Sequence, residues 1–197
     1  DEPRTRMFWE EGIGEWQTVR NQLPKQNGYL WNRKPMWGFV NEADPYIMEM
    51  QINAAADHGV NVFIYDWYWF NAPDGYSGPY LESALNDGFL KAPSNRKMNF
   101  YLMYANHFVK YNYWNYHIHG DNTDILFNPT IDMDQWKKIV ERVITQYFHL
   151  PNYVKIDGAP VFAIFSIDTF VNSFPTREEA AKAMEYLCNA EFITGHV

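Results

Sequence analysis

Two apolar runs constrain the fold of this 197-residue chain more than any other feature of its sequence. Within residues 60–66 (VNVFIYD) and 99–105 (NFYLMYA), most consecutive positions are apolar, as at 62–65, without the alternation that marks a strand with one wet face. Runs of this kind are typical of strands that are covered on both faces. We therefore predict two strands of a parallel sheet.

Helical patterns separate and follow these strands. Helices are predicted over 44–58, 79–92, 132–150 and 176–187, and a short one over 15–21. The long ones carry apolar residues at the i, i+3 or i+4 spacing of one buried face. Their capping signals are Asp44 before Pro45, Asp132 or Asp134, and Thr176 with Glu179.

A third strand is predicted near the end of the chain. The Asp157-Gly158 dipeptide separates 153–156 from 160–165, which indicates a local hairpin whose second arm is the more buried one. A further strand at 36–40 is the weakest candidate, because Pro35 and Gly38 interrupt it.

Strands that alternate with helices predict an α/β fold with parallel strands and right-handed crossovers. A (β/α)8 barrel takes about 250 residues, whereas this chain offers three or four strands. We predict a partial (β/α)8 TIM-barrel-like fold, or a small open sheet. It forms a single domain, complete or not, over 1–197, with a loop-rich entry segment over 1–35. Such a sheet leaves edges that we expect another copy, another segment or a missing remainder to cover.

The composition excludes several classes of partner. Lys and Arg total 16 against 24 Asp and Glu, and the net charge of −8 argues against nucleic acids and acidic membranes. No apolar run approaches the roughly 20 residues of a membrane-spanning helix. No glycine-rich phosphate motif follows a strand, and we expect no cofactor. The single cysteine, Cys188, excludes an internal disulfide.

Aromatic residues make up 18% of the chain, although many of them lie among Asp, Asn and Gly. Trp and Tyr in polar surroundings suit flat, partly wet surfaces, and a sugar ring offers a matching C–H face. The alternative is that these side chains fill an ordinary core.

Ligands of parallel sheets bind at the carboxyl ends of the strands. The first such end carries Asp66 followed by Trp67, Tyr68 and Trp69, which place a carboxylate beside stacking platforms. The second carries Asn106 and His107, which can bind hydroxyls and shuttle a proton. A capping aspartate and a satisfied loop histidine are the structural alternatives.

Three other chemistries receive little support. Ser166 with Asp168 ends the third strand, but an aspartate there can simply shape a turn. His117 and His119 lack the apolar strand that would hold two metal ligands rigidly, so no metal is expected. Cys188 has no paired histidine pattern, which leaves a covalent hydrolase unsupported.

Several segments together resemble the bacterial glycoside hydrolase family 99-like proteins, including the WbsX-like group. The resemblance runs over about residues 12 to 165. Its segments are Gly14-Glu15-Trp16, Asp44-Pro45 with Met48 and Gln51, His58-Gly59-Val60, the D-W-Y-W-F run from Asp66, Leu81-Glu82, the G-F-L-K-A run from Gly88, and Tyr104-Ala105-Asn106. It implies a (β/α)8 barrel that acts on glycans, with endo-acting cleavage of α-mannosides by two carboxylates through a 1,2-anhydro sugar.

The chain departs from that family in three respects. Nothing before Glu15 matches the Tyr-Tyr-x-Pro type strand with which similar members begin. His107 stands where many WbsX-like members have glutamate. The second half of the barrel, with at least one expected carboxylate, has no counterpart in these residues.

These considerations favour a glycoside hydrolase-like protein acting on an oligosaccharide or polysaccharide, in the periplasm or outside a bacterial cell. The predicted catalytic residues are Asp66 and His107, and the predicted substrate-binding residues are Trp67, Tyr68, Trp69, Asn106, Glu15 and Trp16. Two alternatives stay open: a glycan-binding module without chemistry, and a glycosyltransferase-associated WbsX-like protein.

Overall fold

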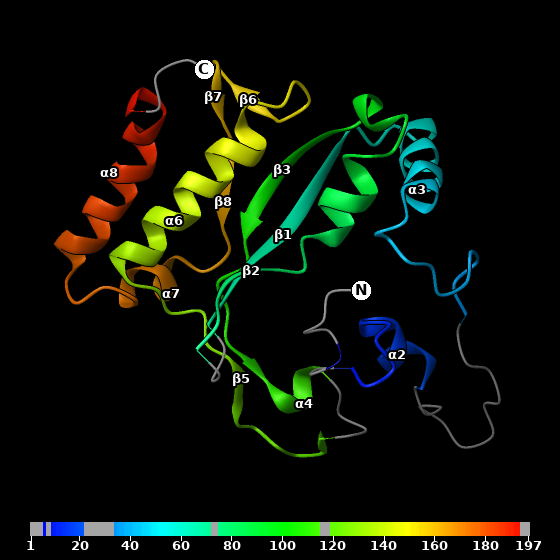
Figure 1. Ribbon diagram of the computed structural model, residues 1–197, viewed down its shortest axis with the longest axis horizontal. Coiled ribbons are helices and arrows are strands. Elements are labelled where there is room, and N and C mark those ends of the chain that lie inside the picture. Colours follow the sequence, from blue (N-terminus) through cyan, green and yellow to red (C-terminus); the bar gives the residue numbers. More distant parts are fainter. Residues whose placement is uncertain (1–5, 7–8, 22–33, 72–74, 115–118, 194–197) are drawn as a thin grey trace.

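The centre of the molecule is a four-stranded sheet with the order β2-β1-β3-β8 (Figure 1). The computed structural model describes residues 6, 9–21, 34–71, 75–114 and 119–193. The strands of this sheet are β1 (Val62–Asn71), β2 (Ser77–Tyr80), β3 (Asn99–Tyr104) and β8 (Phe162–Ile164). Strands β1, β3 and β8 are parallel, and β2 pairs with β1 in the antiparallel sense. The predicted α/β class with parallel strands is therefore confirmed, whereas the described residues form no closed barrel.

Two small ribbons and nine helical segments complete the described part. The ribbons pair β4 (Val109–Lys110) with β5 (Ile125–Phe127), and β6 (Lys155–Ile156) with β7 (Ala159–Pro160). The α-helices are α2 (Glu15–Arg20), α3 (Pro45–Asp57), α4 (Tyr111–Trp114), α6 (Met133–Val143), α7 (Ile167–Asn172) and α8 (Arg177–Ile193). The π-helices η1 (Ala84–Phe89) and η3 (Ile144–Phe148) and the 3-10 turn η2 (Asn95–Lys97) are the others.

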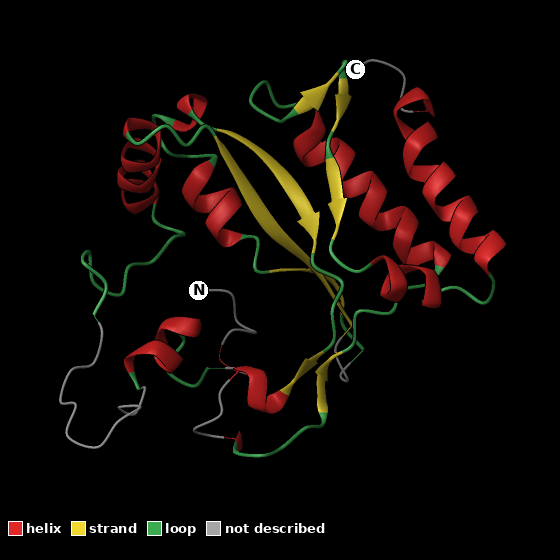
Figure 2. Ribbon diagram, turned by 180° about the vertical axis from the view of Figure 1, so that it is seen from behind, coloured by secondary structure: helices red, strands yellow, loops and turns green. Residues whose placement is uncertain are grey.

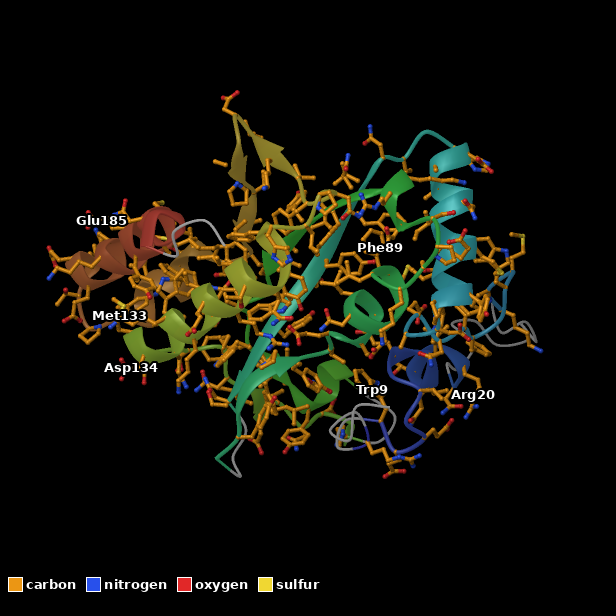
Figure 3. The ribbon with its side chains drawn as sticks, turned by 45° about the horizontal axis from the view of Figure 1, so that its top comes forward. Trp9, Arg20, Phe89, Met133, Asp134 and Glu185 are labelled. Carbon is orange, nitrogen blue, oxygen red and sulfur yellow. The ribbon has the colours of Figure 1, made fainter. Side chains whose placement is uncertain are left out.

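The helices that form the main core pack on one face of the sheet, as Figure 2 shows from behind. From the strands, every second residue enters this core, including Trp67 and Trp69 of β1 and Leu102 and Tyr104 of β3. From the helices come side chains of α3, η1, α6, η3, α7 and α8, among them the fully buried Phe89 (Figure 3). This arrangement gives one deep core along one side of the sheet.

The opposite face of the sheet is open around Ile64 and Asp66, and the prediction that both faces are covered is wrong for this part of the described sheet. Ile64 of β1 is 54% exposed, Asp66 is exposed, and Tyr101 and Met103 of β3 are only half-buried. The sequence does not reveal which face is exposed, because the consecutive apolar residues lie on both faces of each strand. In the described part of the chain, the helices of the main core pack against only one of these faces.

Most local signals formed as the sequence predicts. The Asp44 carboxylate accepts a hydrogen bond from the Tyr46 N–H at 2.9 Å, which caps α3. Asp132 and Gln135 form a reciprocal capping box at the start of α6. The Asp157-Gly158 turn connects β6 to β7, and Asp157 adopts the left-handed conformation that such a turn requires.

Three predicted elements differ from the structure. The helix predicted over 79–92 is shortened to η1, because residues 77–80 instead pair with β1 as β2. The weak strand at 36–40 is a turn. Strand β1 continues to Asn71, five residues beyond its predicted end, because β2 supplies new hydrogen-bond partners there.

A second hydrophobic cluster lies at the far end of β1. Phe70 stacks on Phe127 of β5 with ring centroids 5.1 Å apart, and Trp9 and Tyr80 are buried beside them. This cluster joins the N-terminal segment and the β4–β5 ribbon to the end of β1.

The packing of η1 against the segment before α3 generates a testable prediction. Gly88 is buried, and the backbone carbonyl of Glu42 occupies the position that a Cβ atom at residue 88 would take. We expect Gly88→Ala to lower the free energy of unfolding by about 1–3 kcal/mol despite the better helix propensity of alanine. Urea denaturation measures this change, with the exposed Asp87→Ala as the control in the same turn. Equal stability of Gly88→Ala and the parent chain would contradict the close approach.

Candidate functional site

Strand β1 changes its partner at one point, and the candidate site lies there. Trp67 is the last residue paired with β3, opposite Tyr104, and Tyr68 is the first paired with β2, opposite Tyr80. Because successive side chains of a strand point to opposite faces, Asp66 and Tyr68 lie on the open face while Trp67 lies on the helix-covered one. The predicted site residues of β1 therefore fall into two groups, one on the open face and one inside the core.

The open face brings together polar and aromatic groups from three strands. Asp66 is exposed beside Met103 in the strand register. The ring of Tyr68 contacts that of His107 at a centroid distance of 6.0 Å, and His107 in turn contacts Phe165 at 5.3 Å. His107 follows β3 and Phe165 follows β8, so the predicted convergence at the carboxyl ends of the strands holds for these side chains.

Two carboxylates act on the Tyr68 phenol. Burial of the phenol, together with the negative charges of Asp66 and Glu15, raises the pKa of Tyr68 to about 12. Tyr68 therefore stays a neutral hydrogen-bond donor at physiological pH.

The predicted residues Glu15 and Trp16 lie on α2. Glu15 is exposed, and its negative charge contributes to the raised pKa of Tyr68. Trp16 of the same helix is half-buried and packs edge-on against Phe39 at 5.7 Å.

The two indoles predicted to stack on sugar rings are instead inside the core. Trp67 is 1% exposed and Trp69 is 5% exposed. Trp67 Nε1 donates a hydrogen bond to Glu82 at 2.8 Å, and Trp69 Nε1 donates to Ser77 Oγ at 3.1 Å. Their polar atoms are satisfied by the protein, and their rings offer no surface to a ligand. The reason is the strand period of two, which turns positions 67 and 69 toward the helices.

Asn106 also has a role other than the predicted one. Its side chain is 1% exposed, its Nδ2 donates to the Ser166 carbonyl at 2.8 Å, and its Oδ1 accepts from the Ser166 N–H at 2.8 Å. The amide therefore fastens the end of β3 to the end of β8 and is not available for a hydroxyl.

The third predicted strand end, Ser166 with Asp168, lies at the start of a helix. Ser166 caps α7, and Asp168 lies on α7 beside a hollow of about 370 Å³ between α7 and α8.

A charged network on the helix-covered side anchors β1 next to the site. The Glu82 carboxylate accepts hydrogen bonds from Trp67 Nε1, from Arg142 Nε at 2.9 Å and from the Tyr147 hydroxyl at 2.8 Å. Its hydrogen bond to Arg142 is the main cause that raises the pKa of this guanidinium. Leu81, just before Glu82, has a positive φ of 58°, an uncommon conformation for this residue type. The family resemblance includes Leu81-Glu82, but no sequence pattern indicated this anchoring role, since the three main partners of Glu82 are 15 to 65 residues away.

Of the two histidines at 117 and 119, His117 lies outside the described residues. The ring of His119 packs against Tyr111 at 5.0 Å. Within the described part of the chain, no three His, Cys, Asp or Glu side chains are arranged to hold a metal ion.

The Glu82 network predicts a strong coupling between Glu82 and Arg142. The two side chains are 12% and 32% exposed, so their charges are poorly screened. We expect a double-mutant cycle of Glu82→Ala and Arg142→Ala, measured by urea denaturation, to give a coupling energy above about 1 kcal/mol. The exposed Lys91–Asp87 pair, also built from single alanine variants, is the control and should give less than about 0.5 kcal/mol. Equal coupling in the two cycles would refute the anchoring role.

The raised pKa of Tyr68 predicts a loss of stability at alkaline pH. An unfolded tyrosine ionises near pH 10, before the folded phenol does, so the contribution is complete below about pH 10 and is lost as the pH rises toward about 12. We expect Tyr68→Phe to lose less stability than the parent chain between about pH 9 and 11. Parallel curves of the free energy of unfolding against pH would show that this phenol is not perturbed.

Comparison with known proteins bears on what this site does. The family model described as "Glycosyltransferase WbsX" matches residues 3–195. The uncharacterized protein WxcX of Xanthomonas campestris pv. campestris, from strain B100 and from strain ATCC 33913, is 23% identical over 164 residues. That match covers 83% of this chain and 22% of the relative, so the chain spans about a fifth of the length of these curated relatives. No solved structure gives a significant match.

Among the described residues, no helix combines the length and the apolar character needed to cross a membrane.

The family match extends over nearly the whole chain and confirms the resemblance to the WbsX-like group. It supports a function related to glycans. This chain belongs to the WbsX glycosyltransferase family.

Proposed function

We propose that the open face at the carboxyl ends of β1, β3 and β8 binds a glycan, and that the protein cleaves a glycosidic bond there. The observation that carries this proposal is the grouping of Asp66, Tyr68 and His107 on a solvent-accessible face. A carboxylate, a neutral phenol and an imidazole supply the hydrogen-bond donors and acceptors that sugar hydroxyls need. They also include groups capable of proton transfer.

Asp66 and Glu15 are the proposed carboxyl pair. Glycoside hydrolysis generally requires two carboxyl groups on opposite sides of the scissile bond. Both carboxylates are exposed, and the negative charges of both raise the pKa of the Tyr68 phenol. In the proposed reaction, one carboxyl group protonates the leaving oxygen while the other assists the attack, either directly or through a sugar hydroxyl. Tyr68 donates a hydrogen bond and, with its raised pKa, does not act as the base.

His107 is the second group that can move a proton in this site. Its ring lies between Tyr68 and Phe165, at centroid distances of 6.0 and 5.3 Å. In the proposed site it assists Asp66, in place of the glutamate that many WbsX-like proteins carry after the Ala-Asn pair. The family resemblance suggests mannose-containing chains as substrates. An open face also suits attack within such a chain, because both ends of the chain can extend past the site.

Glycosyl transfer is the second candidate, and the description of the matching family favours it. Transfer and hydrolysis both replace a group at an anomeric carbon, and they differ in whether a sugar hydroxyl or water accepts the glycosyl unit. An assay that follows both fates separates them. Release of new reducing ends from an oligosaccharide supports hydrolysis, whereas glycan elongation from an activated donor supports transfer.

The carboxyl pair gives a direct test in the full-length protein. We expect Asp66→Asn and Glu15→Gln each to lower the rate of reducing-end release from mannose-containing oligosaccharides by about 10²–10⁴-fold. Asp134→Asn is the matched control, because Asp134 is an exposed carboxylate on α6, on the opposite side of the molecule from α2 (Figure 3). Thermal unfolding of all three variants checks that the fold is intact. Full activity of Asp66→Asn would remove Asp66 from the proposed reaction.

A further inference from the structure

We infer that Phe165 is the surface on which the sugar ring stacks in this site. The inference rests on the glycan site proposed above and deepens it, because it assigns the stacking role that Trp67 and Trp69 cannot perform. Phe165 is 57% exposed, although it directly follows strand β8 and lies beside the polar groups of the open face. Phenylalanine is among the residue types most often fully buried, and here its ring is exposed next to His107.

The backbone on both sides of Phe165 is held firmly. Its N–H donates to the Tyr104 carbonyl at 3.0 Å, which continues the pairing of β8 with β3. The next residue, Ser166, forms both hydrogen bonds with the buried amide of Asn106. Buried amide hydrogen bonds of this kind are costly to break. Phe165 is thus a fixed element of the sheet edge and not a side chain on a free loop.

The Asn106 amide also determines which side chains are neighbours. Asn106 precedes His107, and Ser166 follows Phe165, so joining 106 to 166 sets His107 and Phe165 side by side. Their rings meet at 60° with centroids 5.3 Å apart. More than half of the Phe165 surface stays accessible to solvent after this contact. Asn106 is therefore a positioning residue for the pair.

The chemistry around Phe165 matches a saccharide. The face of an aromatic ring carries partial negative charge, which attracts the polarised C–H groups on the flat side of a sugar ring. The hydroxyl groups at the rim of that sugar then need polar partners, and Asp66, Tyr68 and His107 lie on the same face. An entirely apolar partner would leave the Asp66 carboxylate desolvated and unpaired, at a substantial cost. The ligand class that fits is a pyranose unit of an oligosaccharide with one hydroxyl-poor face.

Binding measurements on the full-length protein test the inference. A panel of oligosaccharides that includes mannose-containing chains identifies a ligand, and isothermal titration calorimetry gives its Kd for each variant. We expect Phe165→Ala and Phe165→Leu to raise Kd by about tenfold or more, and Phe165→Trp to keep it within about threefold of the parent value. Leucine retains apolar bulk without a ring, so it separates stacking from simple burial. Tyr46→Ala, at an aromatic residue that is 79% exposed on α3, is the control and should leave Kd unchanged.

The outcomes separate this inference from the function on which it rests. If the protein binds an oligosaccharide and Phe165→Ala binds it as tightly, the stacking role is wrong while the glycan site stands. If light scattering shows that Phe165→Ala instead dissociates an oligomer without changing Kd, the exposed ring serves a protein contact and the inference is also overturned. If the parent protein binds no member of the panel, the proposed function fails and the inference fails with it.

Discussion

The one-sided packing of helices on the parallel sheet is the constraint on which the rest of this structure depends. Trp67, Leu102 and Tyr104 enter a core shared with α6 and α8, which removes their apolar surface from water and fixes the rotation of each strand. Once that face is set, the intervening residues must point the other way. Asp66 and Tyr68 reach the open face for this reason, so the position of the candidate site follows from where the hydrophobic free energy is gained.

Two polar anchors refine this arrangement from the buried side. Glu82 ties β1 to η1, α6 and η3 through Trp67, Asn86, Arg142 and Tyr147. Asn106 ties the end of β3 to the start of α7 through Ser166. Buried polar groups stabilise a structure only when their partners are placed well, so such anchors favour one geometry over its neighbours. Trp67, which donates to Glu82, is next to Asp66 in sequence, and Asn106 is next to His107, so each anchor acts beside a side chain of the proposed sugar site.

The proposed sugar site consists of a few solvent-accessible side chains whose backbone is held by buried hydrogen bonds. The Asp66 carboxylate, the Tyr68 phenol, His107 and Phe165 come from β1 and from the segments that follow β3 and β8. The Glu15 charge comes from α2, far from them in sequence. Such a constellation suits glycan chemistry, in which hydroxyl recognition, ring stacking and proton transfer must occur together. It agrees with membership of the WbsX family and gives that membership specific residues to test.

The sequence by itself determined the elements whose signals are local: the Asp44 and Asp132 caps, the Asp157-Gly158 turn, the two long apolar strands and the D-W-Y-W-F segment. It also located the polar strand ends, because parallel strands bring their carboxyl ends to one edge. It could not tell which side of each strand the helices cover, so Trp67 and Trp69 were predicted in the site and Phe165 was not. Only the tertiary structure decided that, because the choice depends on partners such as Glu82 and Arg142 that are distant in the chain and meet only after packing.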